Sequence, residues 1–197
     1  MSTPLPVNAA LFAFGLSLGA TAVAAPAPTS FDQVLADKGR IDFVFKQMNV
    51  PIEGHFRKFK TDLVFDPAAP EKSTVRLELD LASIDAGSSE ANTEVVKKSW
   101  FNVKESPTAA FVSTSVKPLG GNRFAVAGKL TVKGKTQNVT APVSVTQQGN
   151  IATFDGGFTL KRLEFAIGDG MWADTSVVAN EVEVRFRAVA ARSGAVK

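Results

Sequence analysis

Residues 73–85 read STVRLELDLASID and give the clearest indication of the fold. Apolar side chains occupy every second position from Val75 to Leu81, and charged side chains occupy most of the positions between them. A period of two sends successive side chains to opposite faces of a β-strand. The stretch therefore predicts an antiparallel strand with one face toward the protein interior and the other toward water.

The same alternation recurs along the chain, and turn-forming Gly, Pro, Asn and Asp residues separate its occurrences. In one of these segments the apolar phase changes between Phe56 and Phe59, which indicates a bulge or bend near Lys58. Together with residues 73–85, the pattern predicts eight strands. The other seven are Arg40–Met48, Ile52–Asp66, Thr108–Val116, Arg123–Lys133, Lys135–Thr146, Asn150–Lys161 and Glu181–Ala188.

One segment breaks the alternation. Residues Ser88–Asn102, SSEANTEVVKKSWFN, begin with residues that cap helices and predict one short helix between the third and fourth strands. Ala166–Asn180 has no regular pattern and is expected to form a long loop. Because closure removes exposed strand edges, a single closed barrel is favoured over a sandwich. The expected fold is all-β, an eight-stranded antiparallel barrel with one short helix.

The N-terminal region has the features of a secretory leader. No Lys or Arg occurs between Met1 and Asp37, and the uncharged run Ala9–Val23 would span roughly 22 Å as a helix, short of the roughly 30 Å hydrocarbon core of a bilayer. Small residues at Ala22 and Ala24 fit a signal peptidase site. We expect a signal peptide at residues 1–24, a single domain at 25–197 and a periplasmic location. An uncleaved anchor or a wrongly assigned start is the alternative, because the first residues carry no basic side chain.

The composition excludes several kinds of chemistry. The chain has no Cys, no Tyr and one His, so disulfides, thiolate nucleophiles, Cys-ligated metals and His-rich metal sites are ruled out. The carboxylates, Ser, Thr and Lys form no recognisable catalytic arrangement. The net charge of +3 is too dilute to indicate nucleic-acid binding. We therefore expect a protein that is not an enzyme and that carries no metal or cofactor.

An eight-stranded barrel is either filled by side chains or wide enough to hold one small ligand, and composition alone leaves both readings open. The alternation places a set of apolar side chains on the inner wall, and four more aromatic side chains near the expected helix end and loop lie where they could close a mouth. The inner-wall set is Phe43, Phe45, Phe56, Leu77, Leu79, Phe111, Phe124, Phe158 and Phe186, and the mouth set is Trp100, Phe101, Phe165 and Trp172.

Five segments, in this order, resemble the YceI-like family of bacterial polyisoprenoid-binding proteins over nearly the whole mature chain. They are GHFRKFKTDLVFDP (54–67), VRLELDLASIDAGS (75–88), SWFNVKESPTAAFVSTSV (99–116), FAVAGKLTVKGKTQNVTAPV (124–143) and FTLKRLEFAIGDGMWAD (158–174). The resemblance implies a lipocalin-like barrel, export to the periplasm and an elongated apolar cavity. Many relatives carry a His near the position of Gln47, so a polar contact at that end is not carried over.

The ligand that the resemblance implies is a long isoprenoid, a quinone or a fatty-chain amphiphile. Burial of roughly 15 to 20 chain carbons would contribute on the order of 12 to 16 kcal/mol before ordering and association costs. Arg162 continues the phase of Phe158 at a strand end and is the candidate contact for a polar head. The expected function is non-enzymatic carriage or storage of this ligand, with transient contact with a membrane or membrane protein, as a monomer or dimer. The alternative is a stress-protective or interaction module that has a filled barrel and acts through its surface.

Overall fold

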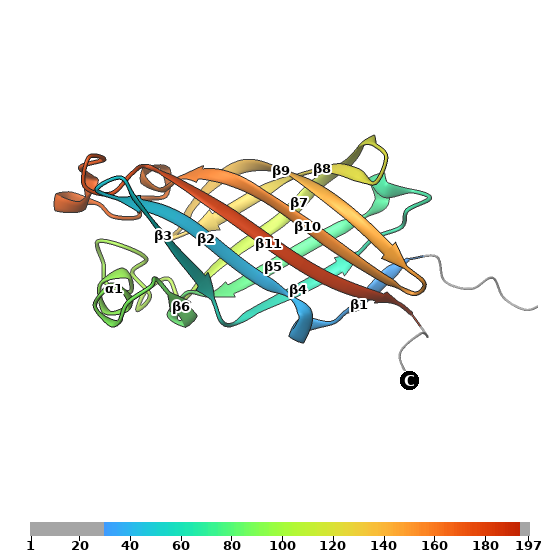
Figure 1. Ribbon diagram of the computed structural model, residues 1–197, viewed down its shortest axis with the longest axis horizontal. Helices are drawn as coiled ribbons and strands as arrows, with labels where there is room; N and C mark the ends of the chain where they lie inside the picture. Colours follow the sequence, from blue (N-terminus) through green and yellow to red (C-terminus); the bar gives the residue numbers. More distant parts are fainter. Residues whose placement is uncertain (1–29, 194–197) are drawn as a thin grey trace, which may run out of the picture.

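The computed structural model describes residues 30–193, which contain eleven strands and one α-helix (Figure 1). The helix, α1, spans Ser89–Val95. The strands are β1 (Phe31–Val34), β2 (Arg40–Gln47), β3 (Val50–Phe56), β4 (Phe59–Val64), β5 (Thr74–Asp80), β6 (Ile84–Asp85), β7 (Thr108–Gly120), β8 (Arg123–Val132), β9 (Lys135–Gln148), β10 (Ile151–Lys161) and β11 (Glu181–Arg192). Short 3₁₀ helices span Ala36–Lys38, Pro70–Lys72, Leu81–Ser83, Arg162–Phe165 and Gly170–Ala173. The expected signal peptide at 1–24 lies outside the described residues.

All of the strand pairs are antiparallel, and the sheet curls back on itself. Its order is β4-β5-β7-β8-β9-β10-β11-β2-β3-β6, and β3 runs on into β4 just as β5 runs on into β6. Each broken strand therefore pairs with the other along both of its halves, β4 with β5 and β3 with β6. Figure 1 shows the resulting elongated, barrel-like sheet, with α1 at one end and β1 toward the other.

Within residues 30–193, the all-β class and a single α-helix are confirmed, whereas the count of eight strands is not. The expected strand 52–66 is divided at Arg57 and Lys58, where the phase change indicated a bend, and the expected strand 73–85 is divided at Leu81–Ser83. The two breaks lie opposite each other. The backbone N–H of Lys58 donates to the buried hydroxyl of Ser83 at 3.0 Å, so a side chain accepts this hydrogen bond where the backbone pairing of the strands is interrupted.

A further strand, β1, was not predicted from the sequence. It pairs with the end of β11, and Phe31 exchanges backbone hydrogen bonds of 2.8 and 3.0 Å with Phe65 just beyond β4. Its four residues, FDQV, are too few to display a period. These tertiary contacts fix its position.

The helix is shorter than expected. Ser88 caps it by accepting a hydrogen bond from the N–H of Ala91 at 3.1 Å, but α1 ends at Val95 instead of near Trp100. Turns follow, in which the N–H of Phe101 donates to the carbonyl of Val95 at 3.0 Å and Asn102 adopts a φ of 52°. The turns place Trp100 against the core, where it is buried.

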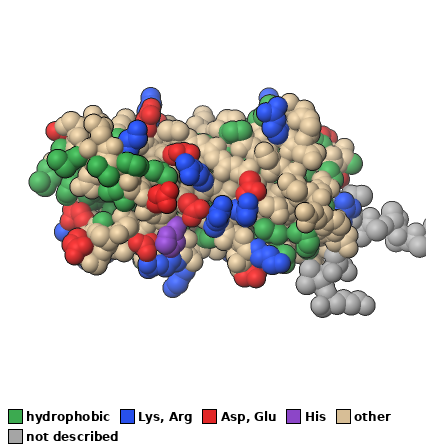
Figure 2. Space-filling model, in the orientation of Figure 1, with side chains coloured by type: hydrophobic (Ala, Val, Ile, Leu, Met, Phe, Trp, Pro, Cys, Tyr) green, Lys and Arg blue, Asp and Glu red, His purple; other side chains and the backbone are tan. Residues whose placement is uncertain are grey.

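The outer face of the sheet carries charge. Arg185 pairs with Glu183 on β11, and Arg187 pairs with Asp155 on the neighbouring β10. Figure 2 shows basic and acidic side chains intermingled over the middle of the visible face. This arrangement is the polar side of the alternation, so the opposite face of the same strands points to the interior.

Candidate functional site

The interior of the sheet holds an elongated cavity of about 610 Å³, within the range of roughly 300 to 1,000 Å³ that is usual for ligand sites. Its wall is made mainly of Phe, Leu, Ile, Val and Ala side chains from the long strands. Thirteen of the fourteen predicted site residues line it. They are Phe43, Phe45, Phe56, Leu77, Leu79, Trp100, Phe101, Phe111, Phe124, Phe158, Arg162, Trp172 and Phe186.

Phe165 is the exception. It is 1% exposed and belongs to the packed core beside Trp100 and Ile167, and it does not contact the cavity. The expectation that it closes the mouth is therefore wrong. Phe165 ends a 3₁₀ helix, and the left-handed Ala166 follows it, so the chain turns and directs this ring into the core.

Three phenylalanine rings leave the cavity open because each packs over a glycine, which has no side chain, on a neighbouring strand. A Cβ atom on Gly54 would lie 2.3 Å from Cζ of Phe43, and one on Gly156 would lie 2.5 Å from Cζ of Phe186. Gly128 stands in the same relation to Phe111, at 2.4 Å. Each ring therefore lies flat across a neighbouring strand instead of projecting into the lumen. Gly128 and Gly156 were not predicted as part of the site, and the signal that identifies them is a glycine at an inward position of a strand.

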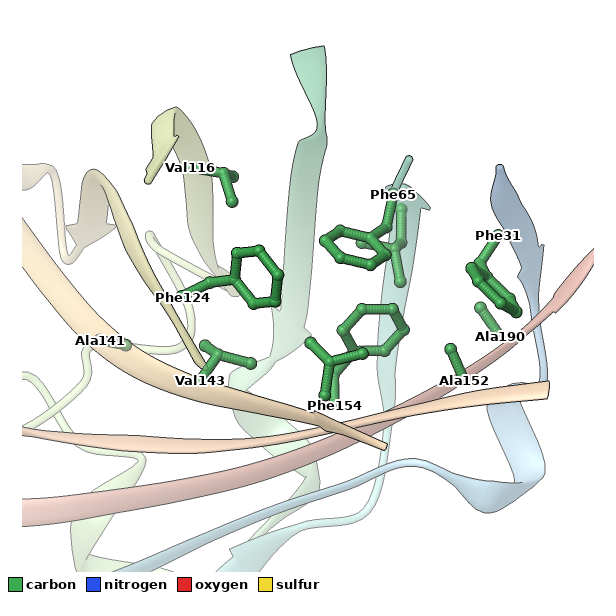
Figure 3. Close-up of a cluster of buried hydrophobic side chains, with 11 residues drawn as sticks. Phe31, Phe65, Val116, Phe124, Ala141, Val143, Ala152, Phe154 and Ala190 are labelled. Carbon is green, nitrogen blue, oxygen red and sulfur yellow. The ribbon is translucent and has the colours of Figure 1, made fainter. Parts of the chain in front are cut away.

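One end of the cavity is closed by packed phenylalanine rings (Figure 3). The ring of Phe65 lies 5.2 Å from those of Phe124 and Phe154, in both cases nearly perpendicular. Phe31 on β1 is completely buried in the same cluster. Edge-to-face packing of this kind leaves no passage for a chain, so this end is the floor of the cavity.

The other end is bordered by α1, the β2–β3 turn and the loop that follows β10. Gln47 on β2 and Glu90 on α1 both line the cavity and are both exposed to solvent. The rings of Phe45 and Phe101 are half-buried there, in contrast to the buried side chains of the floor. The exposed lining marks this end as the mouth.

Arg162 stands near the mouth, but it does not offer a free charge. It is 1% exposed, and all five of its N–H groups donate to backbone carbonyl oxygens. Nε donates to Ala179 at 3.0 Å, Nη1 to Ile167 and Gly168 at 2.9 and 2.8 Å, and Nη2 to Trp172 and Val178 at 2.7 Å each. A guanidinium has five such donors, so none remains for a ligand. The prediction that Arg162 binds a polar head is corrected on this ground.

The buried guanidinium organises the loop instead. Burial lowers the pKa of Arg162, and no ion pair to it occurs within residues 30–193. Its charge is balanced by the carbonyl dipoles and by the Trp100 ring, whose centroid lies 5.7 Å from Cζ. Gly168, at a φ of 73°, leaves room for it, because a Cβ there would lie 2.4 Å from Nη1. Trp172, carried by this loop, packs on Trp100 with ring centroids 5.4 Å apart.

The wall of the cavity carries few polar groups. Residues 30–193 contain no group of three or more His, Cys, Asp or Glu side chains that could hold a metal ion. Within the same range, no helix is long and apolar enough to cross a membrane. Trp100 Nε1 is buried without a hydrogen-bond partner. The arrangement is suited to holding an apolar molecule by contact.

Comparisons with known proteins all point to one family. The model of the YceI-like domain matches residues 33–190. A UPF0312 protein of Azotobacter vinelandii is 33% identical over 162 residues, covering 77% of this chain and 84% of the relative.

Solved structures agree with the match. BcnA of Burkholderia cenocepacia superposes with a TM-score of 0.78 at 46% identity, over 80% of this chain and 99% of that one. A polyisoprenoid-binding domain from Saccharophagus degradans, implicated in plant cell wall breakdown, has the same fold at 14% identity, with a TM-score of 0.65 over 84% and 99% of the two chains. The match to the family model over most of the described residues decides the assignment: the chain belongs to the YceI-like family.

Proposed function

We propose that this protein binds one long apolar chain of the isoprenoid class in its central cavity, and that it carries or stores that lipid without transforming it. The observation that carries the proposal is the cavity of about 610 Å³, apolar along its wall, closed at the phenylalanine floor and open beside α1. A blind tube of this shape accepts a molecule tail first and leaves its polar head at the mouth. The relative from Saccharophagus degradans, described as a polyisoprenoid-binding domain, supports the same ligand class.

The energetics favour a ligand of this kind. Each buried CH₂ contributes about 0.8 kcal/mol, so even half of a chain of roughly 20 carbons outweighs the loss of a few rotatable bonds. A preformed wall reduces the ordering cost further, because its rings already lie flat against glycines. The alternative of a filled barrel acting through its surface is disfavoured, because the lumen leaves room for a chain. The leader-like N-terminal residues support a periplasmic setting for this activity.

The test is native mass spectrometry of the protein purified from its own host, followed by solvent extraction. We expect a species heavier than the polypeptide by the mass of one lipid, and an isoprenoid in the extract. Both tryptophans of the chain border the cavity, so their fluorescence reports refilling of delipidated protein with isoprenoid alcohols of increasing length. A native preparation without lipid, together with no fluorescence response to any alcohol, would refute the proposal.

A further inference from the structure

The mouth of the cavity is surrounded by apolar side chains that face solvent. Within residues 30–193, the three most exposed large hydrophobic residues are Met171, Met48 and Val50, at 84%, 72% and 60% exposure. All three lie at the end of the molecule that carries the mouth. Figure 2 shows hydrophobic side chains gathered at that end of the visible face. We call Met48, Val50 and Met171 the mouth patch.

Backbone geometry holds Met48 out in the solvent. Met48 and Asn49 both adopt left-handed conformations, with φ of 50° and 64°, as a tight two-residue hairpin requires. Asn tolerates this region, whereas a Met there is unfavourable and is uncommon in proteins. A strained backbone that presents a flexible apolar side chain to water points to a partner outside the chain.

The members of the mouth patch belong to one continuous surface. The N–H of Met48 donates to the carbonyl of Val177 at 2.8 Å, and the N–H of Ala179 donates to Lys46 at 2.9 Å, so the β2–β3 turn is tied to the loop that carries Met171. Gln47 and Trp172, the sequence neighbours of Met48 and Met171, line the cavity. The patch therefore adjoins the wall of the cavity.

The chemistry of the patch identifies its partner. Residues 47–52 and 170–173 carry no charged side chain, and the exposed charges that flank them are of both signs, with Lys46 basic and Glu53, Asp169 and Asp174 acidic, so no basic cluster drives the contact. A stable protein–protein interface needs about 800 Å² and roughly 20 to 30 residues on each side, far more than three side chains supply. A lipid bilayer makes no such demand, because each inserted side chain gains free energy separately.

We propose that the mouth patch docks on the surface of a lipid bilayer, with Met48, Val50 and Met171 inserted among the lipids around the mouth. This inference rests on the proposed function, since an isoprenoid resides in a membrane and must leave it to enter the cavity. Docking lets the chain slide from bilayer to cavity wall without exposing its length to water. The patch acts on transfer and leaves affinity unchanged, because none of its three side chains lines the cavity.

The test compares the protein as its host exports it with Met48→Ser/Met171→Ser prepared in the same way, so that the apolar run Ala9–Val23 does not bind the vesicles. Leu119→Ser is the matched control, since Leu119 is 52% exposed in the β7–β8 region, away from the mouth. Co-sedimentation with phosphatidylcholine vesicles measures docking. Uptake of geranylgeraniol preloaded in those vesicles, followed by tryptophan fluorescence, measures transfer. Uptake of the same alcohol added from ethanol measures affinity without a membrane.

We expect the double variant to partition onto vesicles about a hundredfold more weakly, at about tenfold for each side chain lost, and to take up vesicle lipid correspondingly slowly. The double variant should bind the alcohol added from ethanol as tightly as the parent does and should have the same melting temperature. Salt should leave the docking of both proteins unchanged. The Leu119→Ser control behaves like the parent throughout.

Equal partition and equal transfer rates for parent and double variant would overturn the inference. So would a dimer that the double variant dissolves while vesicle binding is unchanged, because a second copy would then cover the patch. If the parent takes up no alcohol from ethanol, the proposed function fails, whereas vesicle sedimentation still decides the docking question on its own.

Discussion

Gly156→Ala tests whether the width of the cavity is set by aromatic rings that pack flat against glycines. A Cβ at this position would lie 2.5 Å from Cζ and 2.9 Å from Cε2 of Phe186, which faces Gly156 across the β10–β11 ladder. Carbon atoms pack at about 3.5 to 4.0 Å, so the ring must move by about 1 Å. The sheet lies behind it and the lumen in front, so the ring moves inward.

The displaced ring occupies space that a ligand would fill. If it removes the contacts of about three CH₂ groups, binding weakens by about 2.4 kcal/mol, or on the order of fiftyfold. The new methyl also lies 2.9 Å from the carbonyl oxygen of Pro142, which adds a modest loss of stability, on the order of 1 kcal/mol. The effect on binding therefore exceeds the effect on stability.

Tryptophan fluorescence titration with isoprenoid alcohols of increasing length is the assay, and thermal unfolding confirms that each variant is folded. Phe186→Leu alone, and combined with Gly156→Ala, completes a double-mutant cycle. We expect the combined variant to recover most of the lost affinity, because a leucine does not reach the glycine. A folded Gly156→Ala protein that binds every alcohol as tightly as the parent would show that the ring does not limit the lumen.

Three further predictions concern the mouth. Arg162→Met leaves five carbonyl oxygens without their donor and should lower the free energy of unfolding by on the order of 3 kcal/mol in chemical denaturation. Arg162→Lys should restore little of this lost stability, because a lysine has three donors and no planar fork. The pKa of Asp85 is lowered, first by the N–H of Gly87 and also by Arg57 and Asn92. The stabilising contribution of this carboxylate is therefore present above the unfolded pKa and is lost as pH falls through the lower folded pKa. Limited proteolysis near α1 should increase in acid, and Asp85→Asn should show that increase already at neutral pH. Glu90 lines the mouth and forms no ion pair within the described residues. Hydrogen bonds from its own backbone N–H and from the hydroxyl groups of Ser89 and Ser88 lower the pKa of its carboxyl group. A polyprenol should therefore bind about tenfold more tightly than its monophosphate at low salt, and Glu90→Gln should reduce that ratio in competition titrations.

Local periodicity predicted the wall of the cavity well. Phe43, Leu79 and Phe111 were placed on the inner face because a strand exposes alternate residues to each side, whatever its neighbours are. The bend near Lys58 could be foreseen for the same reason, since a change of phase must be absorbed by the backbone. These features depend only on residues close together in the sequence.

Features that depend on distant residues could not be predicted in this way. Arg162 has the correct phase to face inward, but its five acceptors come from the carbonyl groups of residues 167–179, and their positions depend on how that loop folds. Strand β1 depends on its pairing with β11 and Phe65. The break at Leu81–Ser83 faces the break in the opposite strand, and the hydroxyl of Ser83 bonds there to the backbone of Lys58. In each case a contact between remote segments decides the local structure.

The use of Arg162 has a consequence for recognition. Because the loop takes up every donor of Arg162, this cation cannot form a hydrogen bond with a head group. The floor of phenylalanine rings likewise offers no hydrogen bond to a tail. Apart from the unpartnered Nε1 of Trp100, discrimination along the cavity then depends mainly on length and thickness, and one CH₂ more or less changes affinity by only about fourfold. Sharper selection must come from the mouth, where Gln47 and Glu90 meet solvent, or from which membrane supplies the lipid. A wall that selects weakly suits a protein that accepts a class of chains, and it makes the mouth the part of the structure on which specificity depends.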